Sequence, residues 1–469
     1  MCVQKKMLHW AIIIGIGIAI WLIPAPEGVK QQGWNMLAIF VSTIVGLILS
    51  PIPIGAMAML AICVAALFKV ATMNELLTGF ASSAAWIAVG AFLLAKGFTK
   101  TGLGRRIALL LLRRFGNSTL KIAYVLTFSD LFFAPATPSN TARGGGIIYP
   151  LIKGLAEVFD SKPGVTARRV GAYLVQTEYQ VCTVTSAMFL TAMVGNPLIP
   201  VFAQKVGNVE VNWTNWALGA IVPGLLALLV FPYVWYKIFP PEIKETPEAP
   251  LMADAELKKA GPMSRGEKIM LSVFLGCLTL WATSPWTKLD STHVAFLGVM
   301  ALVITDVLSW NECLEEKAAW DTLVWVGALV ILASLLAKHG VVAWFAKVVG
   351  ATLVGIPWIA TMGVLILVYL YSHYMFASLS AHITALYPAM LAVAIAGGAP
   401  PLLAALVLAY FSDLCASLTH YGAGMSPVLF GSGFVDQGTW WRLGFIATLI
   451  NLTIWLTVGT LWWKTIGYW

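Results

Sequence analysis

The chain has 469 residues, with 29 Lys and Arg against 21 Asp and Glu, so its formal charge is +8. Hydrophobic residues make up 59% and charged residues 11%, whereas soluble domains average about 45–50% apolar and about 25% charged. This composition excludes a soluble enzyme, a disordered chain and a DNA-binding protein, and it indicates a polytopic membrane protein. At about 20 residues per span plus loops, the length allows roughly ten to twelve spans.

The first apolar run lies close to the amino terminus. Lys5 and Lys6 precede an apolar stretch, Leu8 to Ile23, which is the pattern of a signal peptide. The small residues of a cleavage site do not follow it, because the chain continues with Pro24. We therefore expect residues 1–33 to form an uncleaved leading transmembrane helix with its N-terminus in the cytoplasm.

Further apolar runs fill most of the remaining chain. They lie at 34–50, 54–72, 80–98, 120–152, 170–203, 214–236, 267–286, 293–308, 321–337, 351–398, 401–434 and 443–463. A charged stretch, 237–266, divides the chain in two and is expected to be a cytoplasmic linker. A basic stretch, Lys96 to Arg114, predicts an amphipathic helix on the cytoplasmic surface. The predicted fold class is an all-α polytopic membrane protein with about 11 transmembrane helices plus two re-entrant hairpins.

Short matches recur at a nearly constant offset and indicate an internal repeat. Met73-Asn74-Glu75 returns as Trp310-Asn311-Glu312, 237 residues later, and Tyr149-Pro150 returns as Tyr387-Pro388, 238 residues later. We expect repeat 1 at 34–236 and repeat 2 at 267–469. Each repeat would contain scaffold helices, then a hairpin and a broken helix, at 120–152 and 170–203 in repeat 1 and at 351–398 and 401–434 in repeat 2. Counting spans from a cytoplasmic N-terminus makes the repeats inverted and puts the C-terminus outside, which is typical of secondary transporters.

The first hairpin is interrupted by a polar segment. Two prolines end the incoming helix, and Ser139, Asn140 and Thr141 follow as N-cap residues of a returning helix. Arg143 lies in the first turn of that helix. Because lipid cannot hydrogen-bond a broken backbone, the tip must line protein or water near the middle of the membrane.

The second hairpin has the same pattern. Ser378, Ser380 and His382 follow Ser139, Thr141 and Arg143 by 239 residues. A cation at a helix N-terminus opposes the helix dipole by about 0.3–1 kcal/mol, and a charge deep in the bilayer costs about 2.5–3.5 kcal/mol. A bound anion reverses both effects. Two such tips facing each other would bind a molecule with two carboxylates. The alternative for both basic residues is a buried pair with a local acid such as Asp130.

Each half then supplies a broken helix. The expected ligand-facing residues are Gly195, Asn196 and Pro197 in the first half and Ser417, Thr419, His420, Tyr421 and Gly422 in the second. Gly and Pro within an apolar span mark unwound backbone that exposes polar groups to a ligand; the alternative for the first of these stretches is a helix kink. No catalytic residues, metal site or cofactor are expected, because no P-loop, HExxH or GxSxG motif occurs.

Three acids, Asp130, Glu178 and Asp413, lie within apolar runs. They would bind protons or cations, or pair with a nearby basic residue. The sequence leaves both roles open.

The string Pro138 to Gly146, with Ser-Asn-Thr-Ala-Arg-Gly-Gly-Gly at its core, resembles the divalent anion:sodium symporter family. It is most similar to the exchanger branch, which includes bacterial citrate/succinate and tartrate/succinate antiporters and chloroplast 2-oxoglutarate/malate translocators. The resemblance implies a homodimer in which a transport part moves as an elevator against a scaffold. Sodium-coupled members carry Ser-Asn-Thr at both tips, whereas the second tip here reads Ser378-Leu379-Ser380. The family's Thr-Pro-Pro-Asn-like motif is also replaced here, by His420 to Pro427.

These observations together predict a sodium-independent antiporter for di- or tricarboxylates in a bacterial inner membrane or an organelle equivalent. Arg143 and His382 are expected to do what sodium does in the symporters, so that an empty carrier with uncompensated buried cations crosses poorly. The alternatives are a sodium- or proton-coupled symporter that uses Asp130 or Asp413, an anion channel and an intramembrane enzyme. Nucleic acid is not an expected partner.

Overall fold

The computed structural model describes residues 2–353 and 355–469, and within these ranges the regular elements are helices. Residues 1 and 354, in the predicted leading helix and second hairpin, lie outside the described residues. The α-helices are α1 (Cys2–Leu22), α2 (Gln31–Leu49), α3 (Ile54–Leu67), α4 (Met73–Leu77), α5 (Ser83–Thr101), α6 (Leu103–Phe115), α7 (Thr119–Phe133), α8 (Tyr149–Val158), α9 (Gly171–Met188), α10 (Leu198–Gly207), α11 (Trp213–Ile238), α12 (Glu248–Ala260), α13 (Arg265–Ala282), α14 (Ser284–Thr287), α15 (Ser291–Ile304), α16 (Trp310–Leu314), α17 (Lys317–Lys338), α18 (Val341–Thr352), α19 (Trp358–Ser372), α20 (Leu379–Ala396), α21 (Pro401–Leu414), α22 (Ser426–Leu429), α23 (Gln437–Ile454) and α24 (Thr460–Thr465). Short 3-10 or π segments are η1 (Thr78–Ala81), η2 (Ala134–Ala136), η3 (Thr141–Ile148), η4 (His373–Met375), η5 (Cys415–Leu418) and η6 (Trp455–Gly459).

Many of these helices are long and apolar enough to cross a membrane. Within the described ranges eight helices meet that standard by length and composition, or nine if the bent pair Met73–Ala81 and Ser83–Thr101 counts as one span. The shorter apolar helices α3 and α15 account for part of the difference from the expected number of about 11. The predicted all-α membrane class is confirmed.

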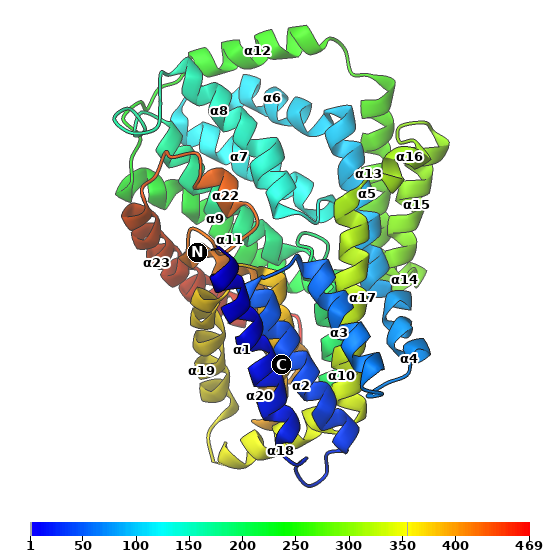
Figure 1. Ribbon diagram of the computed structural model, residues 1–469. Coiled ribbons are helices and arrows are strands. Elements are labelled where there is room, and N and C mark those ends of the chain that lie inside the picture. Colours follow the sequence, from blue (N-terminus) through cyan, green and yellow to red (C-terminus); the bar gives the residue numbers. More distant parts are fainter. Residues whose placement is uncertain (1, 354) are drawn as a thin grey trace.

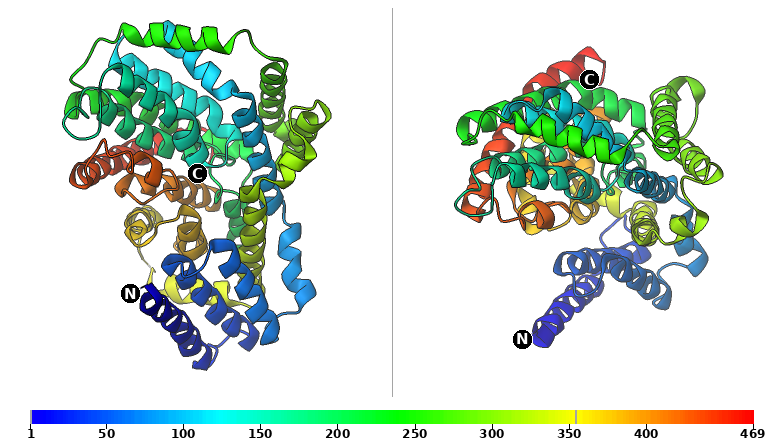
Figure 2. Two further views of the ribbon diagram at one scale, coloured as in Figure 1. Left: turned by 45° about the horizontal axis from the view of Figure 1, so that its top comes forward. Right: turned by 90° about the horizontal axis from the view of Figure 1, so that it is seen from above.

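Helices α5 and α17 pack side by side, and α15 and α4 lie further out on the same side of the molecule (Figure 1). Helices α2 and α3 pack against α17, and α13 and α15 pack against α5. Helix α1 packs mainly on α2 at one end, while α12 lies across α6 at the opposite end, as the further views also show (Figure 2).

The predicted linker is a docked helix in the structure. Arg105 of α6 forms an ion pair with Glu256 of α12 at 2.7 Å, and Arg113 forms one with Asp254 at 3.5 Å. These contacts tie the stretch between the expected repeats to the amphipathic helix of the first half.

Helices α9 and α21 form the centre of the molecule. Every residue of α9 is buried, as are residues 403–414 of α21, and the two helices pack against each other. Both end in irregular backbone, at 189–197 and 419–425. The interruptions lie within the two segments, 170–203 and 401–434, that we expected to be broken.

Two ion pairs connect the halves in reciprocal fashion. Lys100, at the end of α5, donates to Glu312 of α16 at 2.7 Å. Lys338, at the end of α17, donates to Glu75 of α4. The two lysines are 238 residues apart and the two glutamates 237. Each half therefore supplies the base of one pair and the acid of the other.

Candidate functional site: two hairpin tips and two interrupted helices

The first hairpin tip follows α7. Pro135 and Pro138 lack the N–H groups that would continue this helix, and Thr137 takes an extended conformation. The hydroxyl of Ser139 then accepts from the backbone N–H of Ala142 at 3.2 Å, so it caps the returning helix. The return begins with the π-type segment η3 and continues as α8.

The second tip repeats this geometry between α19 and α20. The hydroxyl of Ser378 accepts from the backbone N–H of Ala381 at 3.4 Å. One turn after each capping serine, the N–H of the basic residue donates to the serine carbonyl, at 2.9 Å for Arg143 to Ser139 and at 3.1 Å for His382 to Ser378. The 239-residue offset thus corresponds to equivalent hydrogen bonds at the two tips.

The side chain of Arg143 is directed into the protein and is completely buried. Its Nε donates to Asp130 in a buried ion pair of 2.9 Å, and Thr185 donates to the other oxygen of that carboxylate. The remaining acceptors are Thr137 O (2.9 Å), Ala192 O (3.0 Å), Ser186 Oγ (2.9 Å), Thr185 Oγ1 (3.2 Å), Cys182 O (3.3 Å) and Cys182 Sγ (3.5 Å). This is the pairing that the sequence left as the alternative. Arg143 is therefore not the uncompensated cation that we expected.

His382 is also completely buried, but its neighbours are aromatic. Its ring stacks on Tyr369 with centroids 4.3 Å apart, and the Phe376 ring lies 5.0 Å away. Its Nε2 lies 2.9 Å from Ser372 Oγ and its Nδ1 lies 3.8 Å from Cys415 Sγ. Like Arg143, the imidazole is directed away from the tip backbone and into the protein.

Each tip lies against the interrupted helix of the other half. A Cβ atom on Gly195 would lie 2.9 Å from Ser380 Oγ. On the other side, Thr141 Oγ1 occupies the place that a Cβ atom on Gly424 would take, and Asn140 Oδ1 lies beside it. Glycine at these two positions allows close approach of a hydroxyl to bare backbone.

The first interruption is supported by Asn196. Its amide nitrogen donates to Ser186 O at 3.1 Å and to Phe189 O at 3.2 Å, which satisfies carbonyls at the end of α9. Its amide oxygen has no hydrogen-bond partner among the described residues. Gly195, Asn196 and Pro197 are all buried.

The second interruption is supported from α9 and from the second hairpin. The hydroxyl of Tyr179 lies 2.8 Å from Ala416 O and 2.9 Å from Thr419 O, so its single proton is shared between the two carbonyls. His373 Nε2 lies 2.8 Å from Gly422 O. The sequence did not predict the roles of Tyr179 and His373, because both depend on contacts between segments far apart in the chain.

The expected site residues divide by exposure. Those partly open to the surroundings are Ser139, Thr141, Ser378, His420 and Tyr421. Those buried are Asn140, Arg143, Gly195, Asn196, Pro197, Ser380, His382, Ser417, Thr419 and Gly422. His420 and Tyr421 also bond within the protein, to Trp441 and to the Tyr374 carbonyl, both at 2.9 Å. The tip hydroxyls are thus the expected groups most open to a ligand, while the basic side chains support them from inside.

The three intramembrane acids differ in their surroundings. Asp130 is paired, whereas both carboxylate oxygens of Glu178 and both of Asp413 have no hydrogen-bond partner among the described residues. Both unpartnered acids are buried.

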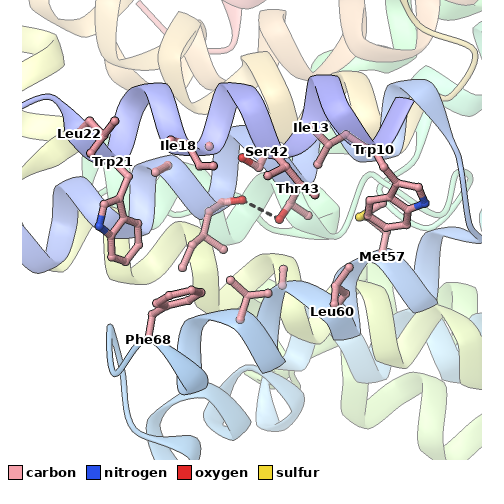
Figure 3. A pocket seen from close by; sticks show the side chains of 16 residues that line it. Trp10, Ile13, Ile18, Trp21, Leu22, Ser42, Thr43, Met57, Leu60 and Phe68 are labelled. Carbon is pink, nitrogen blue, oxygen red and sulfur yellow. Dashed lines mark hydrogen bonds between the residues drawn. The ribbon is translucent and has the colours of Figure 1, made fainter. Parts of the chain in front are cut away.

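A large cavity elsewhere has a different character. It has a volume of about 410 Å³ and lies between α1, α2 and α3, with Trp10 and Trp21 at its ends and Phe68 on its wall (Figure 3). Ser42 and Thr43 contribute hydroxyls, and Thr43 already donates to Ile39 O at 2.7 Å. An apolar cavity of this kind does not suit an anion.

Comparisons with known proteins give matches over nearly the whole chain. A sequence model described as the sodium:sulfate symporter transmembrane region matches residues 4–469. The putative malate transporter YflS of Bacillus subtilis is 48% identical over 99% of this chain and 97% of its own. Dicarboxylate transporter 1 of Spinacia oleracea, a chloroplastic protein, is 45% identical over 97% of this chain and 80% of its own. The inner membrane protein YbhI of Escherichia coli is 36% identical over 99% of each chain.

A solved structure supports the fold. The YdaH transporter of Alcanivorax borkumensis matches with a TM-score of 0.58 at 13% identity, over 99% of this chain and 98% of that one. The resemblance that the first hairpin suggested is confirmed by the family match. The chain belongs to the sodium:sulfate symporter family, also called the divalent anion:sodium symporters, and is a multi-pass membrane transporter rather than an enzyme.

Proposed function

We propose that the protein exchanges di- or tricarboxylates of the malate, succinate, 2-oxoglutarate, tartrate or citrate class across a bacterial inner membrane or an organelle equivalent. The observation that carries the proposal is the pair of matched hairpin tips, each capped by a serine and each packed against the interrupted helix of the other half. The names of YflS and of the chloroplastic relative, which refer to malate and dicarboxylate, support this substrate class.

The substrate would bind between the tips. Ser139, Asn140 and Thr141 from one side and Ser378 and Ser380 from the other offer hydroxyl and amide donors at the starts of two helices. Helix N-termini favour anions because of their free N–H groups and the helix dipole. Gly195 to Pro197 and Ser417 to Gly422 would complete the site with backbone groups.

The proposed mechanism is alternating access of the elevator type. Repeat 1 at 34–236 and repeat 2 at 267–469 would have inverted topology, with the N-terminus in the cytoplasm and the C-terminus outside. The reciprocal pairs Lys100–Glu312 and Lys338–Glu75 support that relationship. We propose that two copies associate as a homodimer, as the family resemblance implies.

We propose that exchange is independent of sodium. The second tip lacks the Asn of the sodium-coupled pattern, and basic residues lie one turn behind both tips. Asp130 balances Arg143, and the described partners of buried His382 are aromatic rings, a hydroxyl and a thiol rather than an acid, so neither side chain would leave an uncompensated positive charge in the empty carrier. Arg143 would instead hold the first tip in place through its bonds to Thr137 and Ala192.

Counterflow in proteoliposomes tests this function. Vesicles preloaded with malate should take up labelled malate in sodium-free choline buffer, while empty vesicles should take up little. Equal uptake by empty vesicles, or a steep and saturable sodium requirement, would reject sodium-independent exchange.

A cation-coupled symporter is the second candidate. The observation that favours it is Asp413, a buried acid whose two oxygens have no donor among the described residues. A buried carboxylate without a partner needs a cation or a proton. Concentrative uptake into empty vesicles, driven by a sodium or proton gradient and lost in Asp413→Asn, would support this candidate over exchange.

A further inference from the structure

Glu178 is a buried acid whose chemistry the tips and their basic residues do not explain. It lies in the middle of α9 with 1% of its surface exposed, and neither carboxylate oxygen has a hydrogen-bond partner among the described residues. It faces the returning helix of the first hairpin at Gly144, where a Cβ atom would lie 3.4 Å from Glu178 Oε1. The Glu178 carboxyl group therefore packs directly against the backbone of the returning helix at Gly144.

The neighbouring ion pair has no capacity left for Glu178. Arg143 has five N–H donors, and they are directed at Asp130, at three backbone carbonyls and at hydroxyls of α9. The oxygens of Asp130 accept from Arg143 and Thr185. Since Asp130 and Arg143 balance each other, an ionised Glu178 would add a negative charge without a formal counter-charge.

An uncompensated carboxylate is strongly disfavoured here. Burying an isolated charge away from water costs far more than burying the neutral acid. The site is also close to the place proposed for an anion: Cys182, one turn along α9 from Glu178, directs its Sγ to Asn140 O of the first tip at 3.8 Å. A dianion at the tips would repel an ionised Glu178 further.

A proton suits this position better than a metal ion. The ionisable groups that face Glu178 are Asp130 from α7, Arg143 from η3 and Cys182 from α9 itself, and the segment before α22 brings Met425. The guanidinium would repel a metal cation, the negative charge of Asp130 is already balanced by Arg143, and thiol and thioether sulfur are poor ligands for sodium. A proton neutralises the carboxyl group and needs no set of ligands.

We propose that Glu178 is a proton-binding site coupled to substrate: its carboxyl group is protonated while a carboxylate occupies the hairpin tips, so that proton and substrate bind cooperatively. The inference rests on the proposed carboxylate transport. Linkage is reciprocal, so an anion that binds better to the protonated carrier also increases the carrier's affinity for the proton.

The test measures malate affinity of the purified full-length transporter, in lipid nanodiscs, from pH 6.5 to 9. Free carboxylic acids with an ordinary pKa of about 4 are ionised throughout this range, so the charge of malate itself is nearly constant. In the wild type we expect affinity to fall with rising pH, approaching about tenfold per pH unit once Glu178 is ionised. Glu178→Gln, which mimics the neutral acid, should bind malate with an affinity that does not depend on pH. Glu157→Gln, the same change at an exposed position of α8, should keep the wild-type slope.

Each other outcome has a definite meaning. A wild-type affinity that is constant with pH overturns the proposal, because no proton would then bind or leave together with malate. A slope that persists in Glu178→Gln, or that only Asp413→Asn removes, places the proton elsewhere and also overturns it. If the wild type binds no di- or tricarboxylate, the proposed transport function fails instead.

A measurement on the wild type alone covers the case in which Glu178→Gln does not fold. Infrared difference spectra between pH 6.5 and 9 should show loss of a protonated carboxylic acid band that shifts in D₂O, and malate should move this loss to higher pH. The absence of a titrating, malate-sensitive band overturns the proposal.

Discussion

Arg143 and Asp130 form a buried ion pair of 2.9 Å behind the first hairpin tip. The positions 239 residues later hold His382 and Tyr369, whose rings stack at 4.3 Å. Each basic residue also approaches a cysteine, Arg143 at Cys182 Sγ and His382 at Cys415 Sγ. The two hairpins therefore have the same backbone hydrogen bonds but surround their basic side chains differently, with an acid in one case and an aromatic ring in the other.

The ion pair is expected to matter chiefly for stability. Asp130→Asn should lower the free energy of unfolding by about 3–5 kcal/mol, because removal of one partner leaves a buried charge without its counterpart. Arg143→Gln should have an effect of similar size, and the double variant should lose less than the sum of the two. Thermal unfolding of the purified protein in detergent measures this. Additive effects of the two substitutions would contradict the buried pair.

The coupling of exchange should not depend on a buried positive charge at Arg143 or His382. The double variant Asp130→Asn with Arg143→Gln removes a pair that is already neutral, and His382→Gln replaces an imidazole whose described partners include no acid. Both variants should therefore keep the wild-type ratio of malate efflux into substrate-free medium to malate efflux into medium with malate. Efflux from proteoliposomes with and without external malate measures the ratio. A raised ratio in His382→Gln would show that the imidazole is charged in the empty carrier.

The close approach of Ser380 to Gly195 and of Thr141 to Gly424 gives a third prediction. Gly195→Ala and Gly424→Ala should each reduce exchange more than tenfold, because a Cβ atom would displace Ser380 from the first interruption and Thr141 from the second. Gly276→Ala on α13, where a Cβ atom meets nothing within 4 Å, should transport normally. Counterflow rates normalised to the amount of folded protein decide the matter. Full activity of both tip-facing variants would mean that the tips do not need this contact.

The sequence predicts the elements of the site better than it predicts their electrostatics. The N-caps at Ser139 and Ser378 follow from local residue types, and the constant offset relates the two tips to each other. For Arg143 the sequence leaves two alternatives open, because sequence distance does not show which side chains meet across α7 and α9. The support that Tyr179 gives to the carbonyls of Ala416 and Thr419 connects positions about 240 residues apart and has no local signal. The hydrogen bonds that use the donors of Arg143, and so leave Glu178 without a partner, likewise depend on three-dimensional packing.

Asn140 offers the most direct test of the tip as a binding site. Asn140→Ala should abolish exchange, because its amide lies at the tip beside Gly424. The protein should still fold, because the Asn140 side chain makes no hydrogen bond to any described residue. The matched control is Asn35→Ala, an amide on the surface of α2 whose partner is Gln31. Malate counterflow, with size-exclusion profiles as the folding check, measures both. Near-normal uptake by Asn140→Ala would reject the proposed site.

The reciprocal pairs between the halves predict a response to acid. The hydrogen bond from Lys100, with help from the N–H of Ser309, lowers the pKa of Glu312 from its usual value to about 2. A carboxyl group with a lowered pKa in the folded state contributes stability above its unfolded pKa of about 4.3, and this contribution disappears as the pH falls toward 2. Lys100→Gln should remove part of it, and the loss at pH 7 should be below about 1 kcal/mol because the pair is partly exposed.

A double-mutant cycle of Lys100→Gln and Glu312→Gln isolates the pair. Its coupling energy should be measurable at pH 7 and should decrease as the pH falls toward 2, where about half of the Glu312 carboxyl groups are protonated. Lys317→Gln, a nearby exposed lysine, should show no coupling to Glu312→Gln at either pH. The cycle of Lys338→Gln and Glu75→Gln should give a coupling energy of similar size at pH 7, since these residues form the equivalent contact in the opposite direction. Coupling in one cycle and none in the other would argue against two halves that support each other in the same way.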